Sequence, residues 1–225
     1  MDNEETRGEI IRIASENLYH LRRYRKDDGS FDYEKYRNIQ TAGNVRKLNN
    51  VWAVEENIIF LSQYIVKMIG QPQFGLCHGT RRGLEQGWFR DHLGCQVMGT
   101  EISPTASDFD NTLHWDFHEH RADWAEKADF VYSNSFDHSY DPRACIHTWV
   151  DSLRPGGLCI IEHSSAHEEE GVSELDPFGC NLLVMPFLLA IWSEGKYAIR
   201  EIISAPVKKS GLAWNWFIVI QKIAC

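Results

Sequence analysis

Short apolar runs alternate with helical segments over the last two-thirds of the chain, and this alternation restricts the fold more than any other feature. Four runs predict strands, at residues 74–77, 95–100, 129–132 and 158–161. Helices are predicted between them at 83–92 and 144–153. Strands that alternate with helices form a mostly parallel sheet with right-handed crossovers. Two later stretches rich in β-branched and aromatic residues, 197–203 and 214–220, predict a final pair of strands.

The first 70 residues have a helical pattern instead. Apolar side chains recur every three or four positions over residues 8–26 and over 54–69, and a short helix is predicted from Tyr33 to about Arg37. We therefore expect two parts, a helical cap of residues 1–70 and an α/β domain of residues 71–225.

Charge restricts the partners of this 225-residue chain. The net charge is −9, which repels a nucleic-acid backbone and an anionic membrane surface. The longest apolar run, Leu182–Trp192, contains Pro186 and falls far short of the roughly 20 residues that span a bilayer. We expect a small-molecule partner, with neither nucleic acid nor membrane.

The cysteines and the N-terminus indicate the compartment. None of the six cysteines forms a C-x-x-C pair or a zinc-ribbon spacing, which favours reduced thiols. The first residues, Met-Asp-Asn-Glu-Glu, are not typical of a secretory signal. We expect a cytoplasmic protein.

A glycine-bearing turn, Cys77–Gly83, joins the first predicted strand to the next helix. Glycines let a backbone approach a ligand closely, and the helix start favours an electronegative group. Glu101 ends the next strand, 22 positions after Gly79. An acid at about this distance can bind both ribose hydroxyls of an adenosine. Alternatively, this carboxylate caps the helix that begins after Ser103-Pro104.

Two further segments have the same character. Asp116 follows a third apparent strand and could accept a hydrogen bond from an adenine amino group, with Phe117 packing on the ring. A solvated loop carboxylate is the alternative. The fourth segment ends a strand in Ser-Asn-Ser, continues through Asp137-His138 to Asp141-Pro142, and precedes Leu-Arg-Pro-Gly-Gly at 153–157.

The order and spacing of these four segments resemble the class I S-adenosylmethionine-dependent methyltransferase family, over residues 73–163 and, in pattern only, over 197–223. The resemblance implies a Rossmann-like, doubly wound sheet of seven strands whose last strand is antiparallel. It also implies S-adenosylmethionine as cofactor, bound over the carboxyl ends of the first strands. The family's cofactor-binding positions match Gly79, Thr80, Gly83, Glu101 with Ile102, Asp116, Phe117, Asn134 and Ser135.

Two residues depart from the family pattern. Cys77 stands where the family often has an acid, and Arg81 where it often has a glycine. Without the acid, the usual contacts to the methionine amino group are in doubt. His78 or Arg81 could bind the methionine carboxylate instead.

Methyl transfer to a hydroxyl or amine requires a base, and histidine suits that role near neutral pH. His138 and His163 are the two candidates, because each follows a strand at the expected ligand edge. Histidines also cluster near acids at 114–120 and at 162–168, but exposed loop histidines are commoner than metal ligands, and we predict no metal site.

Two regions could form the acceptor pocket. One is part of the cap: Tyr33, Tyr36, Arg37, Asn44, Lys47 and Trp52. The other is the insertion from His163 to Trp192, whose apolar half, Leu182–Trp192, could equally be a core helix.

The sequence therefore predicts a methyltransferase that transfers a methyl group to a small-molecule acceptor, with an O-, N- or C-nucleophile left open. A nicotinamide-dependent oxidoreductase is one alternative, although Arg81 replaces the second glycine of G-x-G-x-x-G. A non-catalytic, cofactor-binding partner subunit is another.

Overall fold

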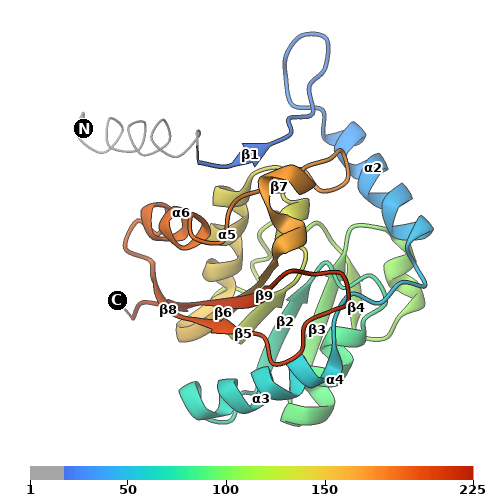
Figure 1. The fold of residues 1–225 in the computed structure, drawn as a ribbon. Coiled ribbons are helices and arrows are strands. Elements are labelled where there is room, and N and C mark those ends of the chain that lie inside the picture. Colours follow the sequence, from blue (N-terminus) through green and yellow to red (C-terminus); the bar gives the residue numbers. More distant parts are fainter. Residues whose placement is uncertain (1–17, 225) are drawn as a thin grey trace.

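A computed structural model describes residues 18–224 and contains a seven-stranded sheet (Figure 1). The strand order is β4-β3-β2-β5-β6-β9-β8. Every neighbouring pair is parallel except those that β9 makes with β6 and β8. This topology confirms the predicted doubly wound sheet with its antiparallel last strand. The strands are β2 Phe74–His78, β3 Gln96–Glu101, β4 Thr112–His114, β5 Ala128–Ser133, β6 Leu153–Ser164, β8 Tyr197–Ser204 and β9 Asn215–Lys222.

Helices cover both faces of the sheet (Figure 1). Helices α3 (Glu55–Ile69) and α4 (Leu84–Leu93) pack on one face, and α5 (Pro142–Ser152) and α6 (Met185–Trp192) on the other. Successive side chains of strand β5 point to opposite faces of the sheet, so this strand contributes to the core on both faces. Phe130 and Tyr132 join the core beneath α3 and α4, whereas Val131 joins the core beneath α5 and α6.

The chain order places a switch point between β2 and β5. From β2 the chain continues outward to β3 and β4, and then returns to β5 on the other side of β2. In open α/β sheets, ligands bind at such a point, outside the carboxyl ends of the strands. At these strand ends, the glycine turn follows β2, Glu101 is the last residue of β3, and the Ser-Asn-Ser segment starts with the last residue of β5.

The N-terminal part differs from the prediction. The helix expected over 8–26 does not occupy residues 18–26, where β1 (His20–Leu21) pairs with β7 (Phe178–Gly179); the rest of that helix lies outside the described residues. The apolar side chains at 18, 19 and 21 pack on the core beneath α5 and α6, so tertiary contacts override their helical spacing.

Helix α2 (Tyr33–Arg46) is longer than predicted and begins at Asp32, whose side chain accepts from the Lys35 amide at 3.0 Å. Helix α3 occupies the predicted place, and its Ile58, Leu61 and Ile65 are fully buried against the sheet. The described part of the predicted cap thus contains two helices. Helix α3 covers the sheet, and α2 lies beyond the edge of the sheet. The division of the chain at residue 70 stays a prediction.

The insertion after β6 contains short 3₁₀ helices at Ser165–His167 (η3) and Glu169–Gly171 (η4), strand β7 and helix α6. Two more lie earlier, at Pro104–Asp108 (η1) and Phe136–His138 (η2). Within residues 18–224, no helix is long and apolar enough to cross a bilayer.

Candidate active site

Two adjoining cavities form one cleft at the carboxyl ends of β2, β3 and β5. One cavity extends toward β3 and β4 and is also lined by Glu101, Ile102, Asp116 and Phe117. The other extends toward α4 and the insertion. The residues that line both are Lys47, Gly79, Arg81, Ser135 and His138.

The glycine turn forms the floor between the cavities. Gly79 has φ +72°, and a Cβ there would lie 2.7 Å from the Cβ of Ser135, so only glycine fits. The amides of Gly79 and Thr80 both donate to the Thr100 carbonyl, at 2.9 and 3.1 Å. The Thr80 hydroxyl is buried and has no hydrogen-bond partner among the described residues. A cleft-lining hydroxyl of this kind is available to a ligand.

Arg81 adopts the left-handed conformation of the glycine that it replaces, with φ +48°. Its guanidinium donates from Nη1 to the Asn50 carbonyl at 2.9 Å, and both residues line the cavity. The turn thus accepts a bulky side chain because that side chain bonds the segment before α3.

Glu101 is 6% exposed and ends β3. Its carboxylate accepts from the amides of Arg81 and Ser103, each at 3.0 Å. Burial raises its pKa, although these two hydrogen bonds act in the opposite direction. The carboxylate therefore braces the turn and the start of η1 while still lining the cleft.

Asp116 joins α2 to the segment after β4. Its carboxylate accepts from the His118 amide at 2.9 Å and from the Tyr33 hydroxyl at 3.0 Å, and it lies 2.7 Å from His118 Nδ1. Burial acts to raise its pKa, but the hydrogen bonds from His118 and Tyr33 outweigh burial and the pKa is lowered. Asp116 is therefore an ionised acceptor beside Phe117.

Three predicted residues line neither cavity. The ring of His78 stacks on Trp149 with centroids 5.0 Å apart, and its Nδ1 lies 2.9 Å from the Thr100 hydroxyl. The ring of His163 lies 3.0 Å from the Cys180 carbonyl. Burial lowers the pKa of each to about 3, so both are neutral. Gly83 directly precedes α4 with φ +73°, and a Cβ there would meet Gln86 at 2.5 Å.

Glu85 is a cleft residue that the sequence interpretation missed. It lies in the first turn of α4, is 7% exposed, and accepts from Asn134 Nδ2 at 3.2 Å. Burial raises its pKa to about 7. It also lies close enough to Cys77 to raise the pKa of that thiol, after the larger effect of burial. An acid directly after the glycine turn was the available signal.

The two predicted acceptor regions meet in the cleft. From the first, Tyr36, Asn44, Lys47 and Trp52 line it, whereas Arg37 pairs with Glu34 on the surface. The insertion contributes Ala166, His167, Leu175 and Asp176. Its apolar half is a core helix, α6.

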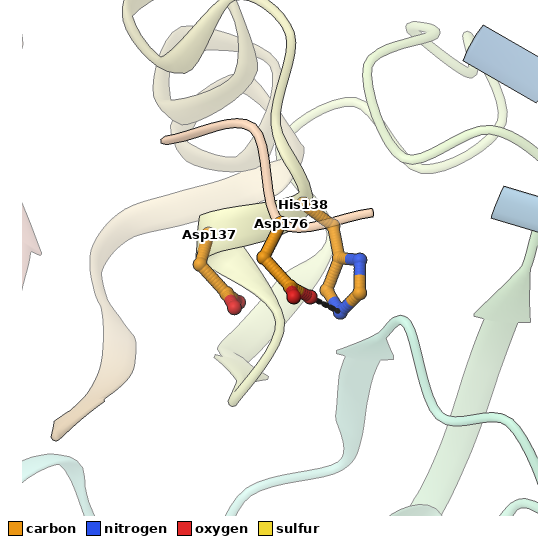
Figure 2. A group of neighbouring side chains, drawn as sticks. All are labelled: Asp137, His138 and Asp176. Carbon is orange, nitrogen blue, oxygen red and sulfur yellow. Dashed lines mark ion pairs between the residues drawn. The ribbon is translucent and has the colours of Figure 1, made fainter. Parts of the chain in front are cut away.

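Three side chains converge where the insertion meets η2 (Figure 2). Asp137 and His138 belong to η2, and Asp176 comes from the loop before β7. His138 Nε2 lies 3.6 Å from Asp176 Oδ1. Neither carboxylate was among the predicted site residues, and no local pattern marks Asp176.

Comparison with solved structures identifies the fold. No protein-family model and no curated protein matches the sequence. A Burkholderia thailandensis 1,6-didemethyltoxoflavin-N1-methyltransferase is 17% identical, with a TM-score of 0.65 over 89% of this chain and 94% of that one. The N-methyltransferase NodS from Bradyrhizobium japonicum is 14% identical, with a TM-score of 0.58 over 82% and 98%.

The plantazolicin methyltransferase BpumL is 13% identical, with a TM-score of 0.58 over 85% and 88% of the two chains. All three were solved with S-adenosylhomocysteine bound. The chain has the fold of class I S-adenosylmethionine-dependent methyltransferases.

Proposed function

We propose that this protein is an S-adenosylmethionine-dependent methyltransferase that acts on a small molecule. The observation that carries the proposal is the placement of Glu101. Its buried carboxylate faces the cleft beside the Gly79 turn, at the switch point of the sheet. The three similar structures described above hold the demethylated product, S-adenosylhomocysteine.

The cleft residues suit the chemical groups of S-adenosylmethionine. Glu101 would hold the ribose hydroxyls, and Asp116 with Phe117 would face the adenine. The Gly79 turn, with the unpartnered Thr80 hydroxyl and the basic Arg81, would receive the methionine carboxylate. Asn134 and Ser135 complete this wall. The predicted roles of His78 and Gly83 are not part of the proposal, because neither residue lines the cleft.

Glu85 would replace the acid that Cys77 lacks. A methionine amino group is cationic, and a carboxylate in the same cleft is its natural partner. Glu85 lines this cleft, where its Oε1 accepts from Asn134 Nδ2 at 3.2 Å. A bound ammonium would favour the ionised form of a carboxyl that burial now holds near a pKa of about 7.

When bound, S-adenosylmethionine supplies a methyl group activated on a sulfonium. The chain's contribution is to align the acceptor with that methyl group and to limit water. Of the two predicted bases, only His138 lines the cleft, so His163 is left out. Helix α2 covers the site through Tyr36, whose hydroxyl donates to the His138 carbonyl at 3.1 Å.

The acceptor is proposed to be small. The cleft lies beneath α2 and the insertion, and the chain's net charge of −9 disfavours a nucleic-acid acceptor. The similar structures include a 1,6-didemethyltoxoflavin-N1-methyltransferase and a plantazolicin methyltransferase. The nucleophilic atom is left open, and the cytoplasmic location expected from the sequence remains part of the proposal.

The test is calorimetric titration with S-adenosylmethionine, S-adenosylhomocysteine, NAD and NADP. We expect saturable binding of the first two, weakened more than roughly tenfold in Glu101→Gln and Glu101→Ala. Glu56→Ala, an exposed acid in the first turn of α3, is the matched control and should bind normally. The proposal would be overturned if the folded wild-type protein bound neither S-adenosylmethionine nor S-adenosylhomocysteine. Binding of a dinucleotide instead would favour an oxidoreductase, and binding of none a partner subunit.

A further inference from the structure

We infer that Asp137, His138 and Asp176 form a binding site for a divalent cation at the acceptor end of the cleft. One ligand-capable atom of each residue lies within 4.8 Å of the other two. Figure 2 shows the three side chains turned toward a common space, two from η2 and one from the loop before β7. All three line the same cavity.

The imidazole of His138 is oriented as a metal ligand requires. Gln40 Nε2 donates to the Leu175 carbonyl at 2.7 Å, so Gln40 Oε1 is the atom that faces His138 Nδ1, at 2.8 Å. An amide oxygen accepts, and Nδ1 therefore carries the proton. In neutral His138 the lone pair is then on Nε2, which points toward Asp176. Such a hydrogen bond behind the ring is the usual support of a ligating histidine.

Asp176 is held in a similar way. Ser173 Oγ donates to its Oδ2 at 3.1 Å, which leaves Oδ1 directed toward His138 Nε2 at 3.6 Å. That separation is too long for a hydrogen bond. It is close to the about 3.3 Å that separates two ligands of a tetrahedral ion with bonds of about 2.0 Å.

Asp137 is a buried carboxylate that lacks a full set of partners. Its side chain is 9% exposed, and Oδ1 makes no hydrogen bond with any described residue. Oδ2 lies 3.9 Å from His167 Nε2, and His167 Nδ1 accepts from the Ser164 amide at 3.2 Å. At 3.9 Å, His167 is too far away to form a hydrogen bond with Asp137, so Oδ2 has only a long contact with this ring. An unpaired buried carboxylate is unfavourable, and a cation would relieve that cost.

The types of ligand indicate which cation suits this site. Lys47, Arg81 and Arg82 line the same cavity, but in residues 18–224 no lysine or arginine forms an ion pair with Asp137 or Asp176, so both carboxylates are available to a cation. Two carboxylates and one imidazole suit Zn²⁺ or Mn²⁺ better than Mg²⁺ or Ca²⁺, which prefer oxygen ligands alone.

The function of this cation rests on the proposed methyltransferase function. The ion would lie in the cavity that all three residues line, beside His138, which lines both cavities, and would hold an acceptor through an oxygen atom. His138 would then serve as a ligand and not as the predicted base, because both roles use Nε2.

The test is calorimetric titration of chelator-treated protein with Mn²⁺ and with Zn²⁺, and electron spin echo measurement on the Mn²⁺ form. We expect one equivalent to bind, with modulation from an imidazole nitrogen that disappears in His138→Gln. Asp176→Asn and His138→Gln should weaken binding more than roughly tenfold, and Gln40→Met about tenfold. His92→Gln is the matched control, because exposed His92 also pairs with an acid, Glu55, but residues 18–224 provide no third ligand there.

The inference would be overturned if the folded wild-type protein bound neither Mn²⁺ nor Zn²⁺. It would also be overturned if the wild type and the Asp176→Asn, His138→Gln and Gln40→Met variants bound the metal equally well. S-adenosylhomocysteine is titrated into the same samples. If it binds and the metal does not, the cation inference fails while the proposed function stands. If the metal binds at this site and S-adenosylhomocysteine does not, the site stands and the proposed function fails.

Discussion

The backbone amide of Arg81 donates a hydrogen bond of 3.0 Å to the carboxylate of Glu101. This contact joins the turn after β2 to the end of β3, and the Ser103 amide adds a second bond to the same side chain. Glu101 thus positions the backbone that surrounds the cleft as well as lining the cleft itself. A change at Glu101 should therefore alter stability as well as ligand binding.

Glu101→Ala should lower the free energy of unfolding by about 1–3 kcal/mol, because two amides lose their acceptor. Glu101→Gln keeps one acceptor oxygen, so its free energy of unfolding should fall by less than that of Glu101→Ala. Urea unfolding of both variants in the absence of ligand gives the comparison. An alanine variant as stable as the wild type would show that Glu101 does not brace the turn.

Arg81 offers a test of backbone strain. Its φ of +48° suits glycine, so Arg81→Gly should be more stable than Arg81→Ala by about 1 kcal/mol. Both variants lose the contact to Asn50, so their difference isolates the backbone. Urea unfolding would contradict this expectation if the alanine variant were the more stable of the two.

Glu85→Gln should weaken S-adenosylmethionine binding roughly tenfold to a hundredfold, because a charge-assisted hydrogen bond to the amino group is lost. Glu56→Gln is the matched control, an exposed glutamate in the first turn of another helix. Calorimetry on the three proteins measures the effect. Equal affinities would remove Glu85 from the proposed site.

Glu85 should also make stability depend on pH. Burial raises its pKa from the ordinary 4.5 to about 7 in the folded chain, so folding favours the protonated form. The associated stability is present in full below pH 4.5 and is lost as the pH rises through 7, by about 3 kcal/mol at most. The free energy of unfolding of the wild type, minus that of Glu85→Gln, should fall across this range in urea melts at several pH values. A difference that does not change with pH would contradict the assigned pKa.

Local patterns in the sequence were sufficient for the sheet and its ligand edge. Apolar runs of four to six residues mark strands, the glycine turn follows the first of them, and Glu101 ends the next. These features depend on neighbours in the chain. The alternation of strands and helices, with Glu101 at the end of its strand, could therefore be predicted from the residues, whereas the antiparallel last strand was implied by the family resemblance.

Only the tertiary structure decided which side chains face the cleft. His163 ends a strand at the predicted edge, yet it packs against Cys180 beneath the insertion. No local sequence pattern marks Asp176. It lies opposite His138 in a loop whose neighbours make two long-range contacts, the pairing of β1 with β7 and the hydrogen bond from Gln40 to the Leu175 carbonyl. Such placements depend on packing between segments distant in sequence. Spacing along the chain determined the scaffold, whereas long-range burial and hydrogen bonding determined the lining of the site.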